Sequence, residues 1–183
     1  MSIAYQLSFV RGTLPEYVTL VAVSKTHPAG AIREAYDAGH RIFGESRPQE
    51  LREKYDVLPK DIEWHMIGHL QTNKIKKVLG RASLIQSVDS EHLLAAIEKE
   101  AAKAGIVQNV LLEVNIGGEE SKTGVSPERL WPLVDAAAAQ EHIRVKGLMA
   151  IPPVNNDDAQ NRRYLAQVYK LFVQAGERGY QNV

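Results

Sequence analysis

Six short apolar segments, each followed by a segment with the apolar spacing of a helix, recur along the 183 residues. Nearly continuous apolar runs of this length are typical of strands that are buried on both faces of a parallel sheet. The expected strands are residues 17–23, 41–44, 62–67, 82–88, 107–116 and 143–151. This alternation predicts an α/β fold in which a helix follows each strand.

The expected helices are marked by residues that favour helix ends. Besides an opening helix from Ile3 to about Gly12, the sequence predicts helices at 28–39, 48–55, 73–79, 91–104, 126–140 and 157–175. Either Asp89 or Ser90 can cap the helix at 91–104, and Gly105 is well suited to end it. Pro28 and Pro127 fall in first turns, where the missing N–H does no harm.

Periodicity alone does not choose between an open doubly wound sheet and a barrel. Polar clusters follow every expected strand in this sequence. An open sheet concentrates its ligand groups at the point where the strand order reverses, whereas a barrel presents them after each strand. The pattern therefore favours a TIM-barrel-like (β/α) arrangement, and residues 1–183 are expected to form a single domain.

Composition narrows the functional classes. Lys and Arg total 22 against 22 Asp and Glu, so the chain has no net positive charge to attract a polyanion. Neither nucleic acid nor a membrane surface is therefore an expected partner. Without cysteine, the chain has no disulfide, thiolate metal site or cysteine nucleophile. The N-terminus lacks a signal-peptide pattern, and no apolar run reaches the length of a membrane span, so we expect a cytoplasmic protein.

Lys25 is the first candidate for chemistry, because it follows the apolar run 17–23 at the expected carboxyl end of a strand. Ligands of α/β proteins bind at that edge of the sheet. The neutral amine of a lysine attacks carbonyl carbons to form an imine, and desolvation or neighbouring cations favour the neutral form. By position alone, a solvated surface charge is the commoner explanation of such a lysine, and a catalytic role is the rarer one.

Other polar segments are weaker candidates. His65 and His69 are four residues apart, but a strand and a glycine separate them from any shared helical face, so no metal site is expected. The loop at 117–124 ends in lysine and threonine like a phosphate loop, yet Ser121 precedes Lys122 where glycine is required. The lysines of residues 71–77 form either a solvated surface or part of an anion-binding one.

Read together, the motifs resemble the pyridoxal-phosphate homeostasis protein family, whose fold is like the barrel domain of alanine racemase. The matching segments are AVSKTHP at 22–28, FGE at 43–45, EWHMIGHLQTNK at 63–74, VNI at 114–116, SKTG at 121–124 and GLMAI at 147–151. They occur in the order of the family and cover about residues 18–151.

The resemblance implies that Lys25 holds pyridoxal 5′-phosphate (PLP) as a Schiff base, the internal aldimine. It also implies that Ser46 and Met149 line the cofactor pocket, and that His65 and Asn115 belong to cofactor-binding motifs. Many family members carry asparagine at the position of Ser46, and a serine reaches less far. Lys122 and Lys74 match family positions near the same rim and are candidate cofactor-handling lysines.

The family continues into two further β/α units, whose loops carry a phosphate-binding cup and an arginine beside the pyridine nitrogen. This sequence ends at residues 179–183, where the seventh strand is expected to begin. We therefore expect six of the eight strands, an incomplete barrel with unpaired edges on the first and sixth strands, and weaker PLP binding.

Three functions are compatible with the resemblance. The first is a protein that binds PLP and takes part in its intracellular homeostasis without turnover of a substrate. The second is a PLP-dependent amino-acid racemase, which needs a base on each side of the cofactor. The third is a cofactor-free assembly, in which a second copy of the chain covers the open barrel edges as a homo-oligomer.

Overall fold

The computed structural model describes residues 2–154 and 157–180 and contains one six-stranded parallel sheet. Its strands are β1 (Ala22–Val23), β2 (Ile42–Glu45), β3 (Glu63–Met66), β4 (Ala82–Val88), β5 (Gln108–Glu113) and β6 (Ile143–Met149). Each strand pairs with the next one along the chain, in the order β1-β2-β3-β4-β5-β6. This order confirms the barrel-type arrangement, because a doubly wound sheet reverses its order part-way.

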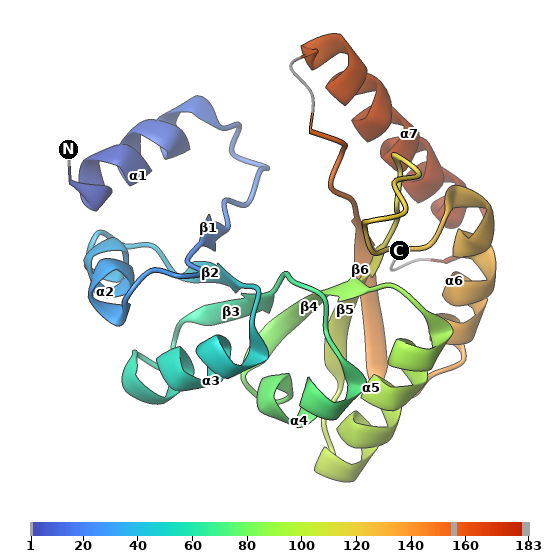
Figure 1. Cartoon of the computed structure of the whole chain (residues 1–183), viewed down its shortest axis with the longest axis horizontal. Helices are drawn as coiled ribbons and strands as arrows, with labels where there is room; N and C mark the ends of the chain where they lie inside the picture. Colours follow the sequence, from blue (N-terminus) through green and yellow to red (C-terminus); the bar gives the residue numbers. More distant parts are fainter. Residues whose placement is uncertain (1, 155–156, 181–183) are drawn as a thin grey trace.

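Helices precede, separate and follow the strands along the chain. They are α1 (Ile3–Thr13), α2 (Ala29–Asp37), α3 (Pro48–Val57), α4 (Ile75–Val78), α5 (Glu91–Ala104), α6 (Leu130–Ala138) and α7 (Asp158–Glu177), with 3-10 turns at Thr72–Lys74 and Pro127–Arg129. Figure 1 shows α2 to α6 following one another round the outside of the curved sheet. Helices α1 and α7 lie at the two ends of this arc, beyond β1 and β6. Among the described residues, β1 and β6 do not pair, so the arc is open.

The hydrophobic core lies between the sheet and the outer helices. Phe43 of β2 is opposite Trp64 of β3, and their ring centroids are 5.9 Å apart. Both side chains are buried among the apolar faces of the helices. Side chains alternate along a strand, so the neighbouring residues Gly44 and His65 belong to the other face of the sheet, which is the concave side of the arc.

Local signals placed most helix ends correctly. Ser90 caps α5 with its side chain, which accepts a hydrogen bond from the Leu93 N–H. Gly105 ends the same helix in the left-handed conformation, with a φ of 64°. Asp157 caps α7 in the same way as Ser90 caps α5. Two expected helices are shorter than predicted, because the segments at 73–79 and 126–140 begin with 3-10 turns.

The first strand was predicted too long. Only Ala22 and Val23 pair with β2, and Tyr17 is 89% exposed. Strand β1 is an edge strand with a single partner, and β2 begins only at Ile42, so residues 17–20 have no strand beside them. Strands β5 and β6 are also shorter than the apolar runs 107–116 and 143–151, and Asn115 lies in a loop.

Two further expectations concern a seventh strand and membrane-spanning helices. The start of a seventh strand is expected at residues 179–183: residues 179 and 180 do not belong to a strand, and residues 181–183 lie outside the described residues. No helix in the described part of the chain is both long and apolar enough to cross a lipid bilayer.

Candidate functional site

Lys25 lies directly after β1, at the carboxyl edge of the sheet. The Ser24 N–H donates to the Gly44 carbonyl at 2.9 Å, which continues the β1–β2 ladder beyond Val23. The Ser24 hydroxyl is on the helix-facing side, where it donates to Oε1 of buried Glu45 at 2.6 Å. Lys25 is the next residue, in the turn that the His27 N–H closes on the Ser24 carbonyl at 3.1 Å, and its side chain is exposed.

A group of polar side chains, buried except for the partly exposed Glu50, lies beside the turn that carries Lys25. We call Ser24, Glu45, Glu50 and Lys54 the Lys54 cluster. The Lys54 ammonium donates to the Ser24 carbonyl at 2.8 Å, to Glu45 Oε1 at 2.7 Å and to Glu50 Oε1 at 2.7 Å. These three acceptors use all three N–H donors of the ammonium.

The Lys54 cluster was not predicted from the sequence. Glu50 and Lys54 have the i, i+4 spacing of a helical ion pair, which is a weak signal because such pairs are common on helix surfaces. Glu45 directly follows the apolar segment 41–44, and an acid that is buried at the end of a strand needs a partner, which is a second weak signal.

His65 lies on β3, on the concave face beside Gly44. The amide nitrogen of Gln86 lies 2.8 Å from Nδ1 of His65, so Nδ1 accepts and the ring proton is on Nε2. Burial lowers the pKa of His65 below its ordinary value, against the opposing effect of the Glu63 carboxylate. His65 therefore presents a neutral imidazole at neutral pH.

Ser46 follows β2 and lies against the end of β3. A Cβ atom added at Gly68 would be 2.4 Å from the Ser46 carbonyl oxygen, so only glycine allows these two backbones to approach so closely. The Gly68 carbonyl accepts a hydrogen bond from the Ser87 hydroxyl at 2.6 Å. The Ser46–Gly68 contact and the Ser87–Gly68 hydrogen bond therefore hold the carboxyl ends of β2, β3 and β4 close together.

Asn115 and Lys122 belong to the loop after β5, and both side chains have partners there. Nδ2 of Asn115 donates to the carbonyls of Glu119 at 2.8 Å and Lys122 at 3.3 Å, while its Oδ1 accepts from the Glu119 N–H. The Lys122 ammonium contacts Glu119 Oε2 at 2.6 Å and the Pro152 carbonyl at 3.1 Å. Asn115 therefore shapes the loop, and Lys122 is held at its rim.

Met149, the last residue of β6, lies opposite Glu113 of β5. Burial raises the pKa of the Glu113 carboxyl, although Thr123 donates to its Oε1 at 2.7 Å. Its other oxygen, Oε2, is buried and has no hydrogen-bond partner among the described residues. Together with Asn115, Lys122 and Ile151, Glu113 lines a pocket of about 230 Å³ at the carboxyl end of β5. Glu113 was not among the site residues predicted from the sequence.

The two histidines with zinc-like spacing have separate partners. His65 contacts Gln86, whereas Nδ1 of His69 lies 3.0 Å from Oδ2 of Asp89. Within residues 2–154 and 157–180, no group of three or more His, Asp or Glu residues is arranged to hold a metal ion.

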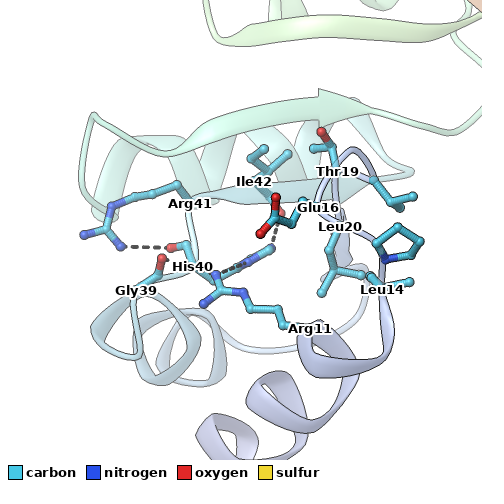
Figure 2. Close-up of a pocket in the computed structure, with 11 residues that line it drawn as sticks. Arg11, Leu14, Glu16, Thr19, Leu20, Gly39, His40, Arg41 and Ile42 are labelled. Atoms are coloured by element: carbon cyan, nitrogen blue, oxygen red, sulfur yellow. Dashed lines mark hydrogen bonds between the residues drawn. The ribbon is translucent and has the colours of Figure 1, made fainter.

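A separate pocket of about 370 Å³ lies at the opposite, amino-terminal end of β1 and β2 (Figure 2). Arg11 of α1 reaches into it, and Nη2 of Arg11 lies 2.8 Å from Nδ1 of His40. His40 Nε2 donates to the Ile42 carbonyl at 2.7 Å. None of the predicted site residues lines this pocket, so it is not part of the Lys25 site.

The family model described as alanine racemase, N-terminal domain, matches residues 1–182. This chain belongs to that family. The pyridoxal phosphate homeostasis protein of Aquifex aeolicus is 45% identical over 153 residues, and that of Schizosaccharomyces pombe is 39% identical over 141 residues. These matches cover 83% and 76% of this chain, but only 67% and 60% of the two relatives.

Solved structures agree with this assignment. PipY of Synechococcus elongatus, in a structure described as having PLP bound, is 34% identical with a TM-score of 0.87. The match covers 97% of this chain and 83% of PipY. The alanine racemase of Clostridium difficile 630 shares only the fold, at 14% identity and a TM-score of 0.80, with 96% of this chain and 47% of the racemase covered.

Proposed function

We propose that this chain binds pyridoxal 5′-phosphate as a Schiff base on Lys25 and takes part in cytoplasmic PLP homeostasis without turnover of a substrate. The observation that carries the proposal is the exposed side chain of Lys25, in the turn that follows the carboxyl end of β1. The names of the relatives and the PLP-bound PipY structure support the same cofactor.

The other predicted site residues carry groups that fit the chemistry of this cofactor. A primary amine condenses with an aldehyde, and the neutral imidazole of His65 offers a flat apolar face with an N–H donor. Ser46 offers a hydroxyl beside the same strand ends, and Met149 an apolar side chain. Asn115 acts through the loop that it closes, and Lys122 places a cation at the rim.

When bound, PLP supplies an electron-withdrawing ring conjugated to the lysine nitrogen. The chain itself supplies the amine of Lys25 and the turn that presents it at the carboxyl edge of the sheet. Racemization also needs a base on each side of the cofactor. The relatives at 39–45% identity are named homeostasis proteins, whereas the racemase neighbour is only 14% identical, so we do not propose racemase activity.

The proposal treats residues 1–183 as a single cofactor-binding unit, with neither nucleic acid nor membrane as partner. Contact between two copies through the edge strands β1 and β6 stays a prediction. Light scattering tests it, since a monodisperse monomer would exclude a stable homo-oligomer.

An absorbance titration tests the proposed function. Purified protein mixed with PLP is expected to develop Schiff-base absorbance that saturates with cofactor. Lys25→Ala should abolish the change, and Lys99→Ala, which removes an exposed lysine of α5, should leave it intact. An unchanged spectrum for Lys25→Ala would rule out Lys25 as the anchor. Chiral chromatography of L-alanine incubated with the loaded protein should show no D-alanine.

A further inference from the structure

The Lys54 cluster contacts the backbone on both sides of Lys25. On one side, the Ser24 carbonyl accepts from Lys54 Nζ at 2.8 Å. On the other side, the Thr26 N–H donates to Glu50 Oε1 at 2.7 Å, and this same oxygen accepts from Lys54. One buried ammonium therefore connects the residues before and after the candidate anchor.

The backbone that these contacts hold is strained. Thr26 has a φ of 66°, the left-handed region that β-branched residues rarely adopt. Such a conformation persists only where the surrounding contacts hold it in place, and it is common at functional sites. Here the contacts are the Glu50 carboxylate on the Thr26 N–H and the Thr26 hydroxyl, which donates to the Lys25 carbonyl at 2.6 Å.

Stability alone does not account for this choice of residues. The Lys54–Glu45 pair is buried, and a buried ion pair contributes little more than a well-packed apolar pair of similar volume. An apolar pair could not donate a hydrogen bond to the Ser24 carbonyl, as Lys54 does. It also could not hold the Glu50 carboxylate, which accepts from the Thr26 N–H. The cluster thus restricts the backbone of the Lys25 turn in a way that packing would not.

We propose that Lys54 is a positioning residue for Lys25: with Glu45 and Glu50, it fixes the β1–α2 turn so that the Lys25 amine meets a carbonyl ligand on the concave face in a productive orientation. This inference deepens the proposed function and rests on it. The Lys54 side chain itself is on the helix-facing side and is not proposed to touch the cofactor.

The experiment compares Lys54→Met, Glu50→Ala and Glu50→Gln with the wild-type protein. Glu50→Ala removes the acceptor of the Thr26 N–H, whereas Glu50→Gln keeps an acceptor oxygen. The matched control is Glu100→Ala on α5, which removes an acid that pairs with Lys103 at i, i+3 and with Lys76. For each protein, borohydride trapping of added PLP gives the rate of adduct formation at Lys25, and NMR gives the hydrogen-exchange rate of the Thr26 amide.

We expect Lys54→Met and Glu50→Ala to speed Thr26 exchange and to slow adduct formation about tenfold or more, because a small misplacement of a reacting group is costly. Glu50→Gln should retain most of the wild-type rate, and Glu100→Ala should change neither measurement. If Lys54→Met does not fold, Glu50→Ala decides, since Glu50 is near the surface.

The failures of the two proposals are distinguishable. A wild-type protein that forms no adduct at Lys25 overturns the proposed function and this inference with it. The other outcome starts from a wild-type protein that does form the adduct. If a folded Glu50→Ala variant then forms the adduct equally fast although its Thr26 amide exchanges rapidly, only the positioning role is overturned.

Discussion

Nζ of Lys54 lies 2.7 Å from Oε1 of Glu45, and the two side chains are only 8% and 0% exposed. The other oxygen of Glu45 is buried without a hydrogen-bond partner among the described residues. Lys54 is therefore the cation beside a carboxylate that water does not reach. Removing one partner leaves the other buried without compensation, which costs more than the pair itself contributes.

Lys54→Met should lower the free energy of unfolding by about 3 kcal/mol. Adding Glu45→Leu to this variant should restore part of the loss, because the remaining side chains are then both apolar. Urea unfolding followed by circular dichroism measures both effects. Equal stability of the Lys54→Met variant and the wild-type protein would show that the pair is not the structural element described above.

Gly68→Ala should destabilise the carboxyl ends of β2 and β3 by about 3 kcal/mol, because the new methyl group meets the Ser46 backbone at 2.4 Å. The matched control is Gly30→Ala in α2, where a Cβ meets nothing within 4 Å. That substitution should instead stabilise the protein by about 0.5 kcal/mol. Thermal or urea unfolding of the two variants compares them, and similar stability changes would contradict the close approach at Gly68.

His40, at the amino-terminal end of the sheet, should make the stability of the protein depend on pH. Burial lowers the pKa of His40 below 6.5, and the Arg11 and Arg41 guanidinium groups add to the effect. The unfolded chain then binds more protons than the folded one below that value, so the unfolding free energy should fall as the pH falls from about 7 to 5. His40→Asn, which keeps an acceptor for Arg11, should flatten this slope. His92→Gln, at an exposed site, should not.

Glu113→Gln should stabilise the protein by about 1 kcal/mol at about pH 8, because the buried carboxylate with an unpartnered oxygen is removed. Burial raises the pKa of Glu113 in the folded state, so the wild-type protein loses stability as the pH rises above the ordinary value of 4.5. At about pH 3, where the carboxyl is almost fully protonated in both states, the two proteins should be nearly equal. A gain of the same size at both pH values would contradict this explanation.

Features that depend on residues close together in the sequence were predicted correctly, whereas features that depend on distant residues were not. Caps such as Ser90 and Gly105 act within one turn, and the structure confirms them. The number of strands followed from short apolar runs. The predicted length of β1 was wrong, because the length of this strand depends on where its partner β2 begins, about 20 residues later.

The candidate site divides in the same way. Lys25 was selected from its position after a strand and from its motif. Glu45 and Lys54 lie nine residues apart on different elements, and only the packing of α3 against β2 makes them partners. Glu113 gave no local signal either, because its burial depends on the loop that brings Thr123 back to β5.

Peptide mapping after borohydride reduction of the PLP-treated protein shows which lysine anchors the cofactor. One pyridoxyl group is expected on the peptide that contains Lys25, and it should be lost in Lys25→Ala. Modification spread over the surface lysines, or found mainly at Lys122 or Lys74 with Lys25 unmodified, would contradict this expectation.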